Sequence, residues 1–303
     1  MPLNSIKEAV KALAESLQLS TVIPSLLLVV VNYWIIWGFG QAESSLVNNY
    51  FTIGIFIILS VSYLLHAFNV PLIRLFEGHV GRKLPIIGKL LALKEAAKTS
   101  EYLKLQSFRE KMPPGVDQQR IEQDIQMYFP NESEYVLPTR LGNTIAAFES
   151  YPQSRYGIDS VAMWPRMYTV LKKNEYIEVV SHYKTHFDFL LNILFISIIL
   201  GLELIFVDCF KHKMFWAGVK LIGFIAVWHI LYSGLLHSAS AWGHTIRVAF
   251  DLFRYDLSEN LRLRRADSLD QERIIWKDAS RFIKINEIIE NRQIFSYEHY
   301  LNN

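Results

Sequence analysis

The 303-residue sequence contains a single cysteine, Cys209, so no disulfide can form within the chain. Acidic and basic residues nearly balance, giving a formal net charge of +2. This absence of a strong net charge excludes a general attraction to nucleic acid. An anionic partner would therefore have to be bound by a local group of basic side chains.

The sequence motifs of common catalytic sites are also missing. There is no Gly-x-Ser-x-Gly elbow, Walker loop, dinucleotide-binding fingerprint, paired-cysteine zinc spacing or His-Glu-x-x-His helix. Cys209 has no nearby base that would activate it as a nucleophile. We therefore expect no catalytic residue, no bound metal and no cofactor.

Long apolar runs dominate what is present. Hydrophobic residues make up 51% of the chain and charged residues 20%. A transmembrane helix needs about 20 apolar residues to cross the hydrocarbon core. Four runs meet this length, at 21–40, 50–70, 187–207 and 214–236. The sequence predicts an all-α integral membrane protein with four transmembrane helices in two hairpins.

These runs divide the chain into five segments. They are an N-terminal amphipathic helix (1–20), a first transmembrane hairpin (21–70), a helical cytoplasmic domain (71–186), a second transmembrane hairpin (187–236) and C-terminal cytoplasmic helices (237–303). The amphipathic helix would lie either on the membrane or on the cytoplasmic domain. In the polar segments, apolar spacing and breakers predict helices over 89–110, over 117–129, from Thr139 onward, over 241–265 and over 270–289.

Basic residues predict the orientation. The loop at 41–49 has no lysine or arginine, whereas the flank of the second run carries Arg74, Arg82, Lys83 and Lys89. By the positive-inside rule, both termini and the middle segment are cytoplasmic. Lys211 and Lys213, between the third and fourth runs, oppose this orientation but are fewer.

Four polar residues interrupt the third and fourth runs. Folding these runs about a turn near Lys211 puts Glu203 level with Lys220, and Asn192 level with His229. Charged residues at membrane depth are costly and face a protein interior, a partner or water. They would therefore form either internal pairs that fix the register of the hairpin or the polar lining of a pore.

A second polar group lies just before the third run, where His182, His186 and Asp188 follow one another. Histidines four residues apart share one helix face and can bind a metal. Membrane-bound desaturases use several such boxes, but no second box is present here. We interpret the segment as a polar interface, with a metal-dependent lipid-modifying enzyme as the alternative.

Arginines are concentrated ahead of the third run, in Pro138-Thr-Arg-Leu-Gly-Asn143, Arg155-Tyr-Gly-Ile-Asp159 and Trp164-Pro-Arg166. Arginine suits bidentate pairing and stacking on aromatic rings. One hypothesis is a rigid structural cluster in which Arg155 or Arg166 pairs with Asp159 or Glu149. The other is a ligand or gating site for an anion, built from Arg140, Arg155, Asp159 and Arg166.

This arginine-containing stretch, with the hairpin that follows it and Ala249-Phe-Asp-Leu-Phe-Arg254, resembles a group of uncharacterised bacterial four-span membrane proteins over residues 138–280. The architecture is also similar to membrane channel effectors of bacterial anti-phage systems, the Hailong type among them. In that type, a signal made by a nucleotidyltransferase controls the pore. The resemblance implies a function and a place in a bacterial inner membrane, but it carries over no functional residue.

We therefore expect a homo-oligomeric, gated pore or membrane-depolarising effector in the lipid bilayer. Its signal would be an anionic nucleotide or oligonucleotide, supplied by a cytoplasmic partner enzyme. The first alternative is a membrane scaffold that anchors or regulates a partner enzyme, and the second is the metal-dependent enzyme named above.

Overall fold

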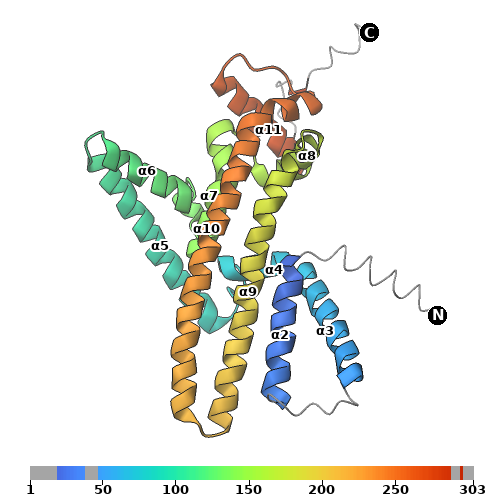
Figure 1. The fold of residues 1–303 in the computed structure, drawn as a ribbon. Coiled ribbons are helices and arrows are strands. Elements are labelled where there is room, and N and C mark those ends of the chain that lie inside the picture. The colour runs from blue at the N-terminus through green and yellow to red at the C-terminus, as the bar shows by residue number, and fades with distance from the viewer. Residues whose placement is uncertain (1–18, 38–46, 288–293, 296–303) are drawn as a thin grey trace, which may run out of the picture. The chain divides into compact units, whose positions relative to one another are not determined.

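The computed structural model describes residues 19–37, 47–287 and 294–295. Within these ranges the chain forms ten α-helices and one short 3-10 helix, η1 (Ser133–Tyr135) (Figure 1). The only extended pairing in the described ranges is an isolated bridge between Leu263 and Phe295. The all-α class is confirmed. The amphipathic helix expected at 1–20 lies outside the described residues except for Leu19 and Ser20, which begin α2.

The chain divides into two compact units. Unit 1 contains residues 1–74 and 184–238, and unit 2 contains residues 75–183 and 239–303. Three helices run across the division: α4 (Asn69–Glu77), α9 (Tyr176–Phe210) and α10 (Met214–Asn260). The chain therefore passes between the units as helix each time.

The candidate membrane-spanning helices belong to unit 1. Both α9 and α10 are long and apolar enough to cross a membrane. A third span exists if α3 (Val47–Ala67) and α4, whose axes are bent by 58° at their junction, count as one. The apolar part of α2 (Leu19–Trp37) is shorter. At 1.5 Å per residue it covers only about 26 Å. The described residues thus support two or three spans, and the predicted four are not confirmed.

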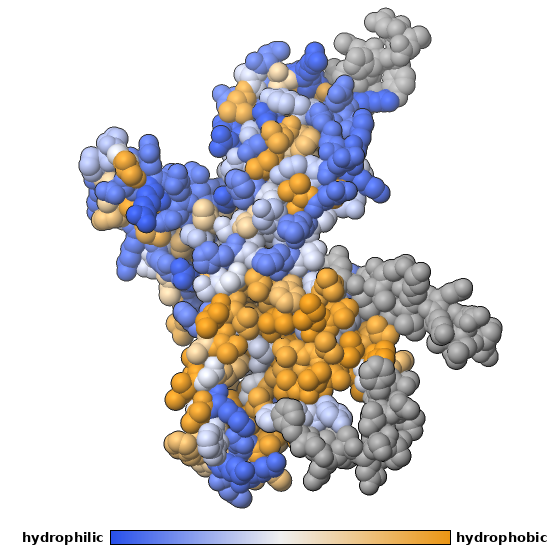
Figure 2. All heavy atoms as spheres, in the orientation of Figure 1, coloured by the Kyte–Doolittle hydropathy of each residue, from blue (hydrophilic) through white to orange (hydrophobic). Residues whose placement is uncertain are grey.

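The surface of unit 1 is apolar. Large hydrophobic side chains point outward along α9 and α10, among them Phe206, Phe215, Ile222 and Ile230. Figure 2 shows hydrophobic residues covering these helices between their polar ends. A soluble monomer rarely exposes so large an apolar surface. Unit 1 therefore has the surface of a membrane protein, while the direction in which the chain crosses stays a prediction.

Small residues allow the helices of unit 1 to pack closely. Ser25 on α2 and Ser62 on α3 are fully buried, and each hydroxyl donates to the carbonyl four residues earlier. Gly201 on α9 lies against Phe224 on α10, whose ring carbon would be 2.4 Å from a Cβ at that position. Such small residues are typical of helix contacts in membranes, where they let backbones approach.

Unit 2 begins with a helical hairpin. Helices α5 (Pro85–Lys111) and α6 (Val116–Tyr128) are joined by Met112-Pro113-Pro114-Gly115, which cannot continue a helix. Tyr102, Ile125, Phe129 and Val136 form a small core of their own at this hairpin.

The rest of unit 2 is a cluster of α7 (Arg140–Tyr156), α8 (Ser160–Lys173), α11 (Leu269–Ile285) and the second half of α10. Its largest buried side chains include Trp276, Phe250, Met163, Met167 and Leu171. Caps set the helix ends, because the side chains of Thr139, Asp159 and Ser268 each accept a hydrogen bond from the first turn that follows.

Candidate functional site

Glu203 and Lys220 each contact a partner in unit 1, and neither partner is the one predicted. Asn32 Nδ2 on α2 donates to Glu203 Oε2 on α9 at 3.1 Å. Lys220 Nζ on α10 lies 2.7 Å from Asp208 Oδ2 on α9. The predicted contact between Glu203 and Lys220 is therefore wrong, and sequence inspection missed Asp208 altogether.

The faces of α9 explain this outcome. Gly201 lies against Phe224, so its side of α9 faces α10. At about 100° per residue, Asp208 lies within about 20° of Gly201 and shares this face, whereas Glu203 lies about 160° away, on the side that contacts Asn32 of α2. The prediction considered depth alone and left out this rotation about the helix axis.

The predicted contact between Asn192 and His229 is also replaced. Asn192 is fully buried, and its Nδ2 donates to the carbonyl oxygen of Ser20 on α2 at 3.0 Å. His229 is exposed on α10. Among the described residues, Asn192 Oδ1 has no hydrogen-bond donor.

The Asp208–Lys220 pair gives a direct test. Removing one partner leaves the other charge uncompensated, so Lys220→Met and Asp208→Asn are each expected to destabilise the protein more than the double substitution does. A coupling energy of about 0.6–1.7 kcal/mol is expected for polar pairs in membranes. Thermal unfolding in detergent provides the measurement, and Lys220→Met with Glu203→Gln is the matched control cycle. Additive effects in the first cycle would contradict the pairing.

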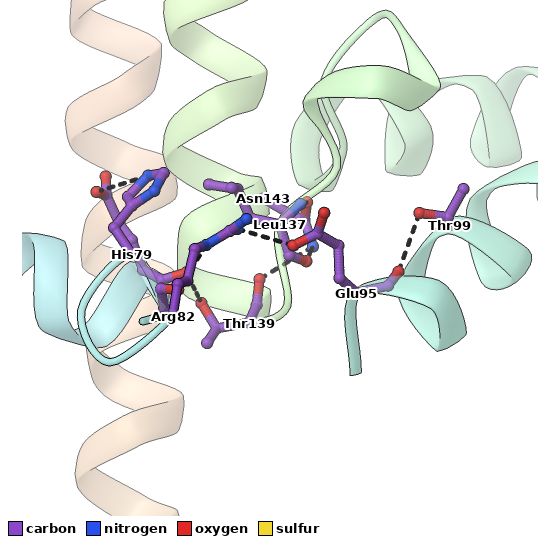
Figure 3. Close-up of polar contacts among 9 residues, drawn as sticks. His79, Arg82, Glu95, Thr99, Leu137, Thr139 and Asn143 are labelled. Carbon is purple, nitrogen blue, oxygen red and sulfur yellow. Dashed lines mark hydrogen bonds and ion pairs between the residues drawn. The ribbon is translucent and has the colours of Figure 1, made fainter. Parts of the chain in front are cut away.

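In unit 2, the Pro138–Asn143 stretch forms a joint with the end of α4 (Figure 3). Thr139 Oγ1 accepts a hydrogen bond from Gly142 N at 2.9 Å and donates to the Glu77 carbonyl oxygen at 3.1 Å. One hydroxyl thus caps α7 and ties it to the last residue of α4. We call the contacts among residues 77–82 and 137–143 the α4–α7 joint.

Asn143 holds the other side of the joint. Its Oδ1 accepts from Leu137 N at 2.7 Å, while its Nδ2 donates to the carbonyl oxygens of Leu137 and Thr139. Three of the four hydrogen-bonding positions of this buried amide are therefore used on the chain that enters α7. Arg82, at the joint, forms a 2.8 Å ion pair with Glu95 on α5, which links the hairpin to it (Figure 3).

Gly142 has no room for a side chain, because a Cβ there would lie 2.8 Å from the Glu77 carbonyl oxygen. Gly142→Ala is therefore expected to lower the free energy of unfolding by about 1–3 kcal/mol, as overpacking does. Gly218→Ala on α10, where nothing lies within 4 Å, is the control and should cause little loss. Thermal unfolding of both variants measures the difference. Equal unfolding midpoints for the two variants would contradict tight packing at Gly142.

The four predicted ligand or gating residues do not gather in one place. Arg140 is exposed at the start of α7, and Arg166 on α8 donates to the carbonyl of Ala162 on its own helix. The Arg155 guanidinium lies 5.7 Å from the centre of the Tyr151 ring. Asp159 caps α8 and pairs with Lys284 on α11 at 2.9 Å, so the pairing of Asp159 with Arg155 or Arg166 is wrong.

Asp159 lines a cavity with charged walls. The space of about 370 Å³ is lined by three cationic side chains of α11, Lys277, Arg281 and Lys284, and by the carboxylates of Asp159 and Glu132. Burial raises the pKa of the Asp159 carboxyl, but the Ala162 amide and Lys284 outweigh burial and hold this pKa below its ordinary value. The carboxylate is therefore charged at neutral pH and neutralises part of the basic lining.

A second cluster in unit 2 was not anticipated. Asp251 on α10 accepts hydrogen bonds from the hydroxyls of Tyr151 at 3.0 Å and Tyr156 at 2.6 Å. The Arg254 guanidinium stacks 4.4 Å from the Tyr156 ring centre and pairs with Glu272 on α11 at 2.9 Å. The cluster ties α7, α10 and α11 together. The two tyrosines on α7 precede Asp251 by about 100 residues, so no local sequence pattern reveals the cluster.

The polar segment before the third run lies within α9. His182 and His186 are exposed, and Asp188 pairs with Lys184. In the part of the chain that the structure describes, no three histidine, cysteine, aspartate or glutamate side chains are placed to hold a metal ion.

Known proteins give no further identification of these sites. No protein-family model, no curated protein and no solved structure matches the chain.

Proposed function

We propose that the protein is a homo-oligomeric membrane pore, gated by unit 2 in response to an anionic signal. The observation that carries the proposal is the pair of polar contacts inside unit 1, Asn32–Glu203 and Asp208–Lys220. Ionisable residues within apolar helices are expensive and usually serve an ion or substrate path. A homo-oligomer is needed because two or three spans cannot by themselves enclose a conduit.

Helical continuity supports control by unit 2. Helices α4, α9 and α10 all pass between the units without a flexible linker, and the α4–α7 joint holds the end of α4 to unit 2. A ligand that shifts unit 2 therefore acts on unit 1 through helices. In a bacterial cell, such a pore would serve as a depolarising effector of anti-phage defence, with a partner enzyme making the nucleotide signal.

Ion flux from proteoliposomes tests the proposal. Full-length protein is expected to dissipate a potassium gradient, followed with a potential-sensitive dye, alone or with added oligonucleotide signals. Glu203→Gln and Lys220→Met should change the rate of flux without changing oligomer size, because a charge at a narrow point alters the barrier to ions. Lys213→Met, in the turn between the helices, is the control and should conduct like the parent. A folded oligomer that passes no ions under any of these conditions would overturn the pore.

A membrane scaffold is the second candidate. It is favoured by the groove of about 870 Å³ along α5, lined by residues from Gly88 to Ser107 together with Arg82. A groove along an exposed helical hairpin suits docking of a partner helix. Absence of flux combined with specific capture of a cytoplasmic enzyme would favour this function.

A further inference from the structure

The first third of α5 has an apolar stripe over which none of the described residues is packed. Ile86, Leu90 and Leu93 follow one another at spacings of four and three, so they share one face of the helix. They are 76%, 55% and 68% exposed. Leu84, just before the helix, is also more than half exposed. After Ala97 the same face turns polar with Glu101 and Lys104, so the apolar surface is confined to the beginning of the helix.

Basic residues border this stripe on both sides. At about 100° per residue, Lys89 lies about 60° to one side of the stripe and Lys94 about 80° to the other. Both lysines are exposed, as is Lys83 in the preceding turn. The acidic residue of this region, Glu95, lies on the opposite face, in the groove, where Arg82 neutralises it. An apolar stripe bordered by lysines is typical of helices that lie in the interface of an anionic membrane.

The chain connects this stripe to a candidate membrane span by a short segment. Only seven residues lie between Glu77, the end of α4, and Pro85, so their Cα atoms are at most roughly 28 Å apart even in a fully extended chain. The connection is in fact folded: Leu84 N donates to the Gly81 carbonyl, and Gly88 lies so near the Arg82 carbonyl that a Cβ would be 2.4 Å away. The stripe thus follows the α3–α4 pair after a short, folded connection.

We propose that residues 83–94 dock on an anionic lipid surface, with Ile86, Leu90 and Leu93 entering the head-group region and Lys83, Lys89 and Lys94 contacting lipid phosphates. The docked segment would fix the base of the α5–α6 hairpin to the bilayer. Each lysine near an anionic leaflet contributes about a fivefold preference for the surface. The charge complementarity and the short connection to α4 favour lipid over a second copy of the chain or a partner helix.

A fluorescent probe tests this in the full-length chain. Leu90→Cys in a Cys209→Ser background, labelled with an environment-sensitive dye, is reconstituted in nanodiscs of neutral or partly anionic phospholipid. We expect a blue-shifted emission and protection from an aqueous quencher in the anionic nanodiscs. The same dye at Ala92→Cys, two residues further on and so about 160° around the helix on the groove face, should stay in water.

Lysine variants test whether the shift in dye emission comes from docking on anionic lipid. Lys89→Gln with Lys94→Gln should lower the ratio of docked to undocked dye roughly 25-fold, since two fivefold contributions are lost. Lys104→Gln with Lys111→Gln removes the same charge from the other end of α5 and should leave the shift intact. All variants must elute like the parent on size exclusion. Emission that is equal in both lipids, or that depends on the number of copies per nanodisc, would overturn the proposal.

Discussion

Asp251→Ala is expected to lower the free energy of unfolding of the protein by about 3 kcal/mol. The substitution removes the acceptor of two tyrosine hydroxyls, and hydrogen bonds to a charged group contribute about 1.5–3 kcal/mol each. The tyrosine hydroxyls would be left in a partly buried site without their acceptor. Thermal unfolding in detergent, followed by tryptophan fluorescence, measures the loss.

Glu259→Ala is the matched control, because it removes an exposed carboxylate from the same helix, two turns further on. It is expected to cost no more than about 0.5 kcal/mol, as surface substitutions do. If the two variants unfold at the same temperature, the Asp251 cluster does not stabilise the fold.

The pH dependence of stability gives a second measurement on the same cluster. Burial, and then the hydrogen bond to Asp251, raise the pKa of Tyr156 to about 12 from 10. A raised pKa means that this stabilisation is complete below pH 10 and is lost as the pH rises toward 12. Tyr156→Phe should therefore lose less stability than the parent between pH 10 and 12. Parallel curves for the two proteins would contradict the role of this hydroxyl.

Gly157→Ala is the second substitution with a large expected effect. Gly157 ends α7 with φ of +78°, and a Cβ there would lie 2.4 Å from the Arg273 carbonyl oxygen on α11. A left-handed conformation costs alanine about 1–2 kcal/mol, and overpacking against backbone adds about 1–3 kcal/mol. We expect a loss of about 3 kcal/mol, because neither the helix end nor the α11 backbone can rotate away.

Gly115→Ala provides the control for Gly157. This glycine precedes α6 with extended backbone, and the nearest atom to a Cβ would be 3.9 Å away. Gly115→Ala should lower the free energy of unfolding by less than about 1 kcal/mol, the usual difference between residues at a helix N-cap. Comparable thermal shifts for the two glycines would show that the contact of Gly157 with α11 is not tight.

Local patterns in the sequence predicted the helices of unit 2 well. The Met112-Pro113-Pro114-Gly115 breaker, the helix start at Thr139 and the continuation of the fourth run into a long helix all follow from residues close together in the chain. The break between α7 and α8, with its cap at Asp159, was not predicted. These signals act within one or two helical turns, so they are legible without knowing the fold.

Contacts between side chains on different helices could not be predicted in the same way. Depth alone suggested Glu203 for Lys220, but Asp208 lies on the face of α9 that packs against α10 and Glu203 does not. The Asp251 cluster depends on the packing of α7 against α10, which no spacing in the sequence encodes. The roles of Arg140, Arg155 and Arg166 in ligand binding stay predictions.

The uninterrupted length of α10 restricts how this chain can change during evolution. Inserting one residue in a straight helix turns everything beyond it by about 100° and advances it by about 1.5 Å. An insertion near the middle of α10 would therefore reorient Asp251 and the residues after it relative to the first half of the helix. Seven inserted residues would restore the angular phase to within about 20°. Helix α9 also runs from one unit into the other. Related chains should therefore gain or lose residues in both helices together, in steps of about two turns.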